Sequence, residues 1–192
     1  MYSIDLMISE HDNILKMLKV IQTKCCHILE NDPFMCSPDG RLTDKACQDF
    51  KDIIDFVRNY ADHHHHGKEE KILFPEMTAR LGKMAENLVT HGMLVEHDLG
   101  RNHIRGLESA LKMLAEDPKI EHKLDVITEA MGYAHLLQIH IEKENSVVYT
   151  FAERSLPQDV KDQIDEKCRA FEEQQTSLGV QKKYLDMLEA VL

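Results

Sequence analysis

Histidines and glutamates recur in this sequence at positions where a helix would place apolar core residues. The chain has 192 residues, of which 12 are histidines. His65 and Glu69 lie four residues apart, and so do His140 and Glu144. Side chains with this spacing lie on one face of a helix, about 5–6 Å apart. Each H-x-x-x-E unit can therefore offer an imidazole and a carboxylate to one site, and these groups bind divalent transition metals.

The two units belong to a longer internal repeat, in segments 65–74 and 140–149. Both segments show the pattern H-x-x-K-E, followed after two residues by two apolar residues and an aromatic one. Two further histidines, His11 and His97, fall in register with the apolar stripes of two other segments. The run 63–66 is internal and overlaps the repeat, so we do not interpret it as a purification tag.

Every predicted helix thus points a histidine into the same interior, and two helices add a carboxylate. Burying a neutral polar group without a partner costs roughly 2–7 kcal/mol, and a carboxylate costs more. No Lys or Arg occupies the stripe positions that face these carboxylates, which makes a salt-bridged core a poor alternative. The pattern predicts a pair of metal ions, with His66 reaching the second ion because it lies about 100° around the helix from His65. A metal-free structural bundle with satisfied core histidines is the other interpretation.

Helical periodicity in four long segments predicts the elements that position these residues. The segments span about residues 4–30, 43–74, 84–116 and 120–154, with Thr43 as a helix cap, Pro75 ending or kinking the second helix, and Val147 on the interior face of the fourth. Short connections favour antiparallel neighbours. We therefore predict an all-α protein, an antiparallel up-down-up-down four-helix bundle with an additional C-terminal helix. Residues 1–156 form the bundle, and residues 157–192 form a helical extension, interrupted at Gly179, that packs on the bundle or mediates self-association as a homodimer.

Composition argues against several classes of partner. The formal net charge is −11, with 34 acidic against 23 basic residues. Nucleic acids and anionic membranes attract clustered Lys and Arg, so we expect neither as a partner. No stretch approaches the roughly 18 apolar residues of a membrane span, and the N-terminus does not resemble a signal peptide. The five cysteines lack C-x-x-C spacing, which favours a reduced, cytoplasmic protein.

The segments HHGKEEKILFP, EHDLGR and HIEKENSVVY resemble the hemerythrin-like family, and the resemblance covers about residues 5–156. That family places a His on the first helix, H-x-x-x-E on the second, a His on the third, and a His plus a carboxylate on the fourth. Carried over, the resemblance implies the metal ligands His11, His65, Glu69, His97, His140 and Glu144. A seventh ligand at His66 gives five histidines and two carboxylates, as in the oxygen-carrying branch. Glu70 replaces Glu69 if the helix is rotated by one position.

Two departures from the oxygen-carrying branch bear on function. His140 and Glu144 form H-x-x-x-E where that branch has H-x-x-x-x-D, and Met93 stands where its third helix carries another histidine. The resemblance implies two iron ions, bridged by carboxylates and an oxo or hydroxo group, with zinc or manganese as alternatives. The expected partner is a small molecule, namely oxygen, nitric oxide or peroxide. The alternatives are an iron- or redox-responsive module that signals to a partner protein, iron handling or storage, and a peroxidase- or oxidase-like enzyme. Binding or sensing is favoured over catalysis.

Overall fold

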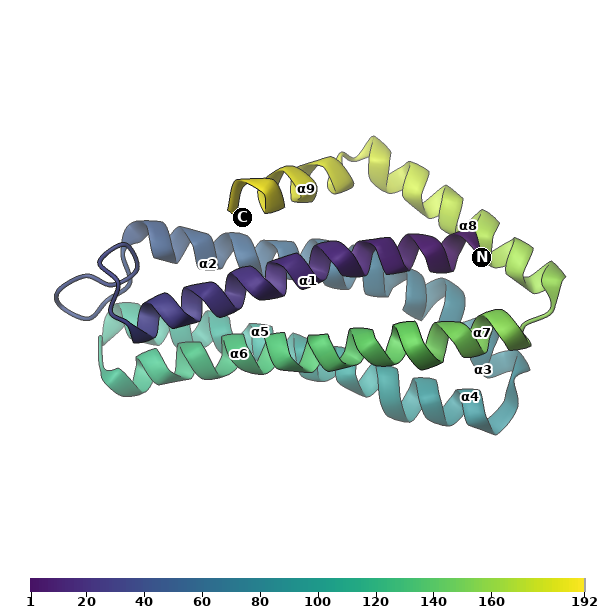
Figure 1. Ribbon diagram of the computed structural model, residues 1–192, viewed down its shortest axis with the longest axis horizontal. Coiled ribbons are helices and arrows are strands. Elements are labelled where there is room, and N and C mark those ends of the chain that lie inside the picture. The colour runs from purple at the N-terminus through teal and green to yellow at the C-terminus, as the bar shows by residue number, and fades with distance from the viewer. Residues whose placement is uncertain (192) are drawn as a thin grey trace.

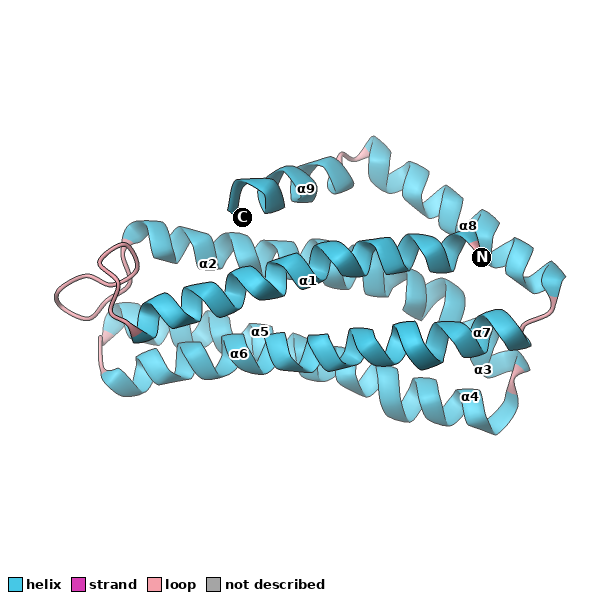
Figure 2. Cartoon of the chain, viewed as in Figure 1, coloured by secondary structure: helices cyan, strands magenta, loops and turns pink. Residues whose placement is uncertain are grey.

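Helices make up nearly all of the structure, a computed structural model that describes residues 1–191. No strand occurs among these residues (Figure 2), and an isolated bridge joins Cys36 to Leu42 in the long loop after the first helix. The prediction of an all-α fold is confirmed. None of the helices in this range is long and apolar enough to cross a membrane.

Four long helical rods run side by side, and successive rods point in opposite directions (Figure 1). The first rod is α1 (Tyr2–Leu29), and the second comprises α2 (Asp44–Phe56), η1 (Val57–His66), η2 (Glu69–Leu73) and α3 (Phe74–Arg80). The third comprises α4 (Gly82–Leu88), η3 (Val89–Met93) and α5 (Leu94–Glu116), and the fourth α6 (Ile120–Lys143), η4 (Glu144–Val148) and α7 (Tyr149–Ser155). Because α1 packs on α6, α6 on α5, α5 on α2 and η1 on α1, the rods close into a bundle.

The segments labelled η are π-helical, with hydrogen bonds from residue i+5 to residue i in place of i+4. The backbone N–H of Phe74, for example, donates to the carbonyl of Glu69. The second rod does not end at Pro75 but continues helically to Arg80, because proline is tolerated in the first turn after such a change in register. The predicted cap is confirmed, since the hydroxyl of Thr43 accepts a hydrogen bond from the N–H of Ala46.

Two apolar clusters fill the bundle, one toward each end. The larger cluster contains Phe50, Phe56 and Leu107, and the other contains Met7 and Phe74. The polar residues singled out in the sequence lie between them.

One apolar position differs from the prediction. Val147 is 50% exposed, while its neighbour Val148 is fully buried. The wider turn of η4 shifts the register from the 3.6-residue period that the prediction assumed.

The C-terminal residues form two further helices, α8 (Gln158–Ser177) and α9 (Val180–Val191), which break at Gly179 where φ is +71°. Both helices pack against α1, and α8 also contacts η2 while α9 contacts η1. Ile164 and Cys168 of α8 and Leu188 of α9 are buried there. The extension therefore covers one side of the bundle (Figure 1), while the domain division after residue 156 and self-association remain predictions.

Candidate metal centre

The seven residues predicted as metal ligands come from all four rods and meet in the layer between the two apolar clusters. Each of them is at most 4% exposed. Their side chains form two groups, and within each group the candidate ligand atoms lie within 4.8 Å of one another. The first group is His11, His65, Glu69 and Glu144, and the second is His66, His97 and His140.

The two carboxylates lie between the groups and contact histidines of both. Glu144 Oε2 is 3.2 Å from His11 Nε2, and its Oε1 is 3.1 Å from His140 Nε2. Glu69 Oε2 is 3.8 Å from His65 Nε2 and 3.5 Å from His97 Nε2. Glu70, the alternative to Glu69, lies outside this centre, with Oε1 2.7 Å from His97 Nδ1. Glu69 and Glu144 are thus placed to be shared by two cations.

Several polar atoms of the centre are buried without a hydrogen-bond partner. They are His11 Nε2, His65 Nε2, Glu69 Oε2, and both carboxylate oxygens of Glu144. Imidazole nitrogens lie near these oxygens, but not in hydrogen-bonding geometry. An unsatisfied buried polar group costs about 1–3 kcal/mol, and more when it is charged. Lone pairs of imidazole and carboxylate that converge in a dry layer suit bound cations, so the residues fit a metal pair.

The sequence profile of the Hemerythrin HHE cation binding domain matches residues 2–152. The chain belongs to this family. Comparisons with curated proteins and with solved structures gave no significant match. Membership in the HHE family and the buried His and Glu groups together make this a cation-binding domain.

The seven predicted ligands are called the HHE centre from here on. Each of its five histidines has its outer nitrogen, Nδ1, bound to a residue outside the centre. The Nδ1 partners of His11, His65, His66, His97 and His140 are, in that order, Asn145, Glu10, Asp62, Glu70 and Glu96, at 2.7–3.3 Å. When Nδ1 carries the proton and donates it to such an acceptor, the lone pair is left on Nε2. The outer partners therefore turn Nε2 of every histidine toward the interior.

The sequence interpretation overlooked Glu10 and Lys68, which form a buried network beside the HHE centre. Lys68 is fully buried, and its ammonium donates to Glu10 and to Glu172 of α8 at 2.5 Å, while its Nζ lies 3.2 Å from Nε2 of His64. Glu10 also accepts from His64 and His65. The prediction that no Lys or Arg faces the interior carboxylates concerned Glu69 and Glu144, whereas Lys68 binds Glu10, a carboxylate that the prediction did not include. The signal was available, because Lys68 is the Lys of the H-x-x-K-E repeat.

Tyr149 is another residue that the sequence interpretation did not assign to the site. It is buried, and its hydroxyl donates to Glu69 Oε1 at 2.6 Å. Its ring stacks on His11 with 5.6 Å between the ring centroids. Tyr149 therefore satisfies one oxygen of Glu69 and leaves the other directed into the centre.

The pKa values of the two carboxylic acids in the HHE centre are shifted in opposite directions. Burial and the neighbouring Glu144 raise the pKa of Glu69 well above its usual value. Burial opposes ionisation of Glu144 as well, but His140 and His11 outweigh it and hold the pKa of Glu144 well below its usual value. Burial and His11 lower the pKa of His65 to about 4. His65 is therefore neutral at pH 7, the form in which an imidazole binds a metal.

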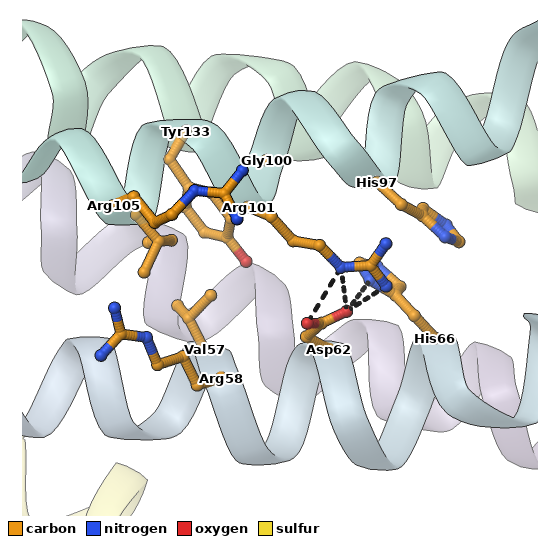
Figure 3. Close-up of a pocket in the computed structure, with 10 residues that line it drawn as sticks. Val57, Arg58, Asp62, His66, His97, Gly100, Arg101, Arg105 and Tyr133 are labelled. Atoms are coloured by element: carbon orange, nitrogen blue, oxygen red, sulfur yellow. Dashed lines mark hydrogen bonds and ion pairs between the residues drawn. The ribbon is translucent and has the colours of Figure 1, made fainter.

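Two histidines of the second group border a pocket of about 260 Å³ between η1 and α5 (Figure 3). His66 and His97 lie at one end of the pocket. Arg101 binds both Asp62 and Glu70, which are the outer partners of these two histidines. The second group therefore lies beside this pocket, whereas Glu172 of α8 covers Lys68 and His64, next to His65 of the first group.

Proposed function

We propose that this HHE domain binds two iron ions and that the di-iron centre binds or reacts with a small molecule, namely oxygen, nitric oxide or peroxide. The observation that supports it most strongly is the pair of carboxylates, Glu69 and Glu144, each in contact with histidines of both groups. Imidazole and carboxylate together suit iron, while zinc and manganese are the alternative ions.

The residues divide between the two ions by position. His11 and His65 would hold one ion, while His66, His97 and His140 would hold the other. Glu69 and Glu144 would be shared. Iron held there would supply electron-transfer chemistry and an open coordination position for the small molecule.

The chain's own contribution is to orient ligands and exclude water. The outer partners fix each imidazole, and Tyr149 keeps its proton directed at Glu69 Oε1. The two apolar clusters keep the layer dry on both sides, which strengthens every electrostatic interaction inside it. The pocket beside His66 and His97 provides a route for the small molecule.

The metal content and visible spectrum of protein expressed with supplemental iron test this proposal. We expect about two iron ions per chain, as a paired site requires, and a visible absorption band that changes with azide, dithionite or oxygen. Glu144→Ala should lose the band and most of the iron, whereas Glu142→Ala, which alters an exposed glutamate on the same rod, should retain both. Colourless protein that takes up no iron would contradict the proposal.

A second candidate function is an iron- or redox-responsive module that acts on a partner or on a second copy of the chain. It is favoured by one chain of contacts, in which Glu172 of α8 binds Lys68, Lys68 binds Glu10, and Glu10 binds the candidate ligand His65. A change in the centre can reach the C-terminal helices by this path. Light scattering of eluting protein, with and without metal, tests it. A metal-dependent change in mass supports the module, and an identical mass opposes it.

A further inference from the structure

The pocket beside His66 and His97 is larger than a diatomic ligand requires. Its volume is about 260 Å³, whereas a water molecule occupies roughly 30 Å³ of the liquid. Its apolar lining includes Val57, Ile104 and the ring of Tyr133. Gly100 adds no side chain to this wall (Figure 3). The pocket therefore has room for an organic molecule of several non-hydrogen atoms.

Tyr133 supplies a hydrogen-bond donor inside the pocket. The residue is 2% exposed, and its hydroxyl has no hydrogen-bond partner in the structure. In Figure 3 this hydroxyl points from α6 into the space bordered by Val57 and Arg101. Burial raises the pKa of Tyr133, so the hydroxyl keeps its proton. A buried donor without a partner, aimed into a cavity, indicates that an acceptor binds there.

The pocket is also rich in guanidinium groups, although the chain carries a net charge of −11. Arg58, Arg101 and Arg105 line it, against the single carboxylate of Asp62. Arg101 forms ion pairs with Asp62 and Glu70, and Arg58 forms one with Glu108. The one hydrogen bond of the Arg105 side chain goes to the side chain of Asn102, and no carboxylate of residues 1–191 pairs with it. Arg105 is therefore the cation that remains available to a ligand.

We infer that this pocket binds a small organic carboxylate as a second substrate or an effector of the metal centre. Arg105 holds the carboxylate, because a guanidinium matches its two oxygens. The apolar body packs on Val57 and Ile104, and a ligand oxygen accepts the hydrogen bond of Tyr133. The inference rests on the proposed function in one respect, since the ligand lies beside His66 and His97 of the second metal position.

Fluorine NMR with 4-fluorobenzoate tests this inference, with neutral 4-fluorobenzyl alcohol as the matched probe. We expect saturable binding of the carboxylate to zinc-loaded protein and binding of the alcohol that is at least about tenfold weaker, the usual order for a charge-assisted hydrogen bond. Arg105→Gln should weaken carboxylate binding about tenfold or more, and Tyr133→Phe about fivefold. Arg154→Gln, which alters an exposed arginine on α7, should leave binding unchanged.

Manganese-loaded protein shows whether the bound 4-fluorobenzoate lies near the metal centre. If the carboxylate lies beside His66 and His97, the bound fluorine is close to the paramagnetic ion, and its signal broadens far more than with zinc. Equal binding of the two probes, or equal losses in the Arg105 and Arg154 variants, would overturn the inference. Saturable, Arg105-dependent binding to metal-free protein would support the carboxylate site even where no metal is taken up. Failure of the carboxylate site can therefore be distinguished from failure of the proposed di-iron function.

Discussion

In both copies of the H-x-x-K-E repeat, the His and the Lys bind the same carboxylate of a neighbouring rod. The Lys is buried in the first copy and partly exposed in the second. In the first copy, His65 and Lys68 bind one carboxylate, Glu10 of α1. In the second, His140 and Lys143 bind one carboxylate, Glu96 of α5. The side chain of Lys68 is fully buried, whereas that of Lys143 is 46% exposed. The arrangement explains why a Lys follows the histidine of each repeat copy by three residues, because that Lys shares the carboxylate that orients the imidazole.

The difference between the copies comes from the C-terminal extension. Glu172 of α8 closes over Lys68, whereas Lys143 pairs with Glu96 and with no residue of the described part of the extension, 157–191. An ion pair in water contributes little to stability, while removing one partner of a buried pair is costly. The buried copy is therefore expected to matter for the fold, and the exposed copy mainly for the orientation of its histidine.

The largest effect should follow removal of the buried ammonium. Lys68→Met leaves Glu10 and Glu172 facing each other without their cation, so it should lower the free energy of unfolding by about 3–5 kcal/mol. Lys143→Met, the matched change in the exposed copy, should lower it by about 1 kcal/mol or less. Urea unfolding of both variants in excess chelator measures this. Equal losses of stability in the Lys68 and Lys143 variants would contradict the expected difference between the buried and the exposed copy.

The next effect concerns metal affinity. Glu10→Gln and Glu96→Gln each weaken the acceptor for Nδ1 of one ligand histidine, a change that typically costs 10–100-fold in affinity. We expect Glu96→Gln near the lower end of that range. Glu10→Gln should lie near the upper end, because Glu10 also accepts from His64 and Lys68. Competition with a chromophoric chelator for zinc gives both values, and a reversed order would contradict the role of burial.

Loss of the contact from α8 should have a smaller effect. Glu172→Gln leaves Lys68 with one carboxylate instead of two, and Glu172 is itself 14% exposed. We expect a loss of about 1.5–2 kcal/mol of unfolding free energy, at the lower end of the range for hydrogen bonds to charged groups. Glu108→Gln, which breaks the exposed pair with Arg58, is the control and should cost about 1 kcal/mol or less. A Glu172 variant as stable as its control would show that α8 does not stabilise the buried copy.

The smallest effect should come from the aromatic residues that end the two copies of the repeat, which differ by one hydroxyl group. Phe74 ends the first and Tyr149 the second, and each stacks near a candidate ligand, His97 and His11 respectively. Tyr149→Phe makes the two alike and removes the donor to Glu69 Oε1. It should lower the free energy of unfolding by about 1 kcal/mol. Unchanged stability in chelator would indicate that water replaces the hydroxyl.

Much of the fold and of the candidate site was predictable from the sequence, because both depend on patterns within single helices. The apolar stripes predicted four rods, and the interrupted stripes identified six of the seven residues that the structure brings together. The seventh, His66, was inferred from its position about 100° around the helix from His65. Glu10 was missed because it adjoins His11, and a single glutamate beside a candidate ligand resembles an ordinary surface residue. Its role appears only when α1 lies against η1, where it meets His65 and Lys68. Glu172 is further still along the chain, so no local pattern connects it to the site.

The π-helical turns restrict how this sequence can change in length. Three of them carry candidate ligands, namely η1 with His65 and His66, η2 with Glu69, and η4 with Glu144. Deleting one residue from such a turn would restore a regular α-helix and rotate every following side chain by about 100°, which would carry the next ligand out of the interior. Relatives that keep the centre should therefore accept insertions and deletions in the loop around residues 30–43 and keep the spacing within the second and fourth rods fixed.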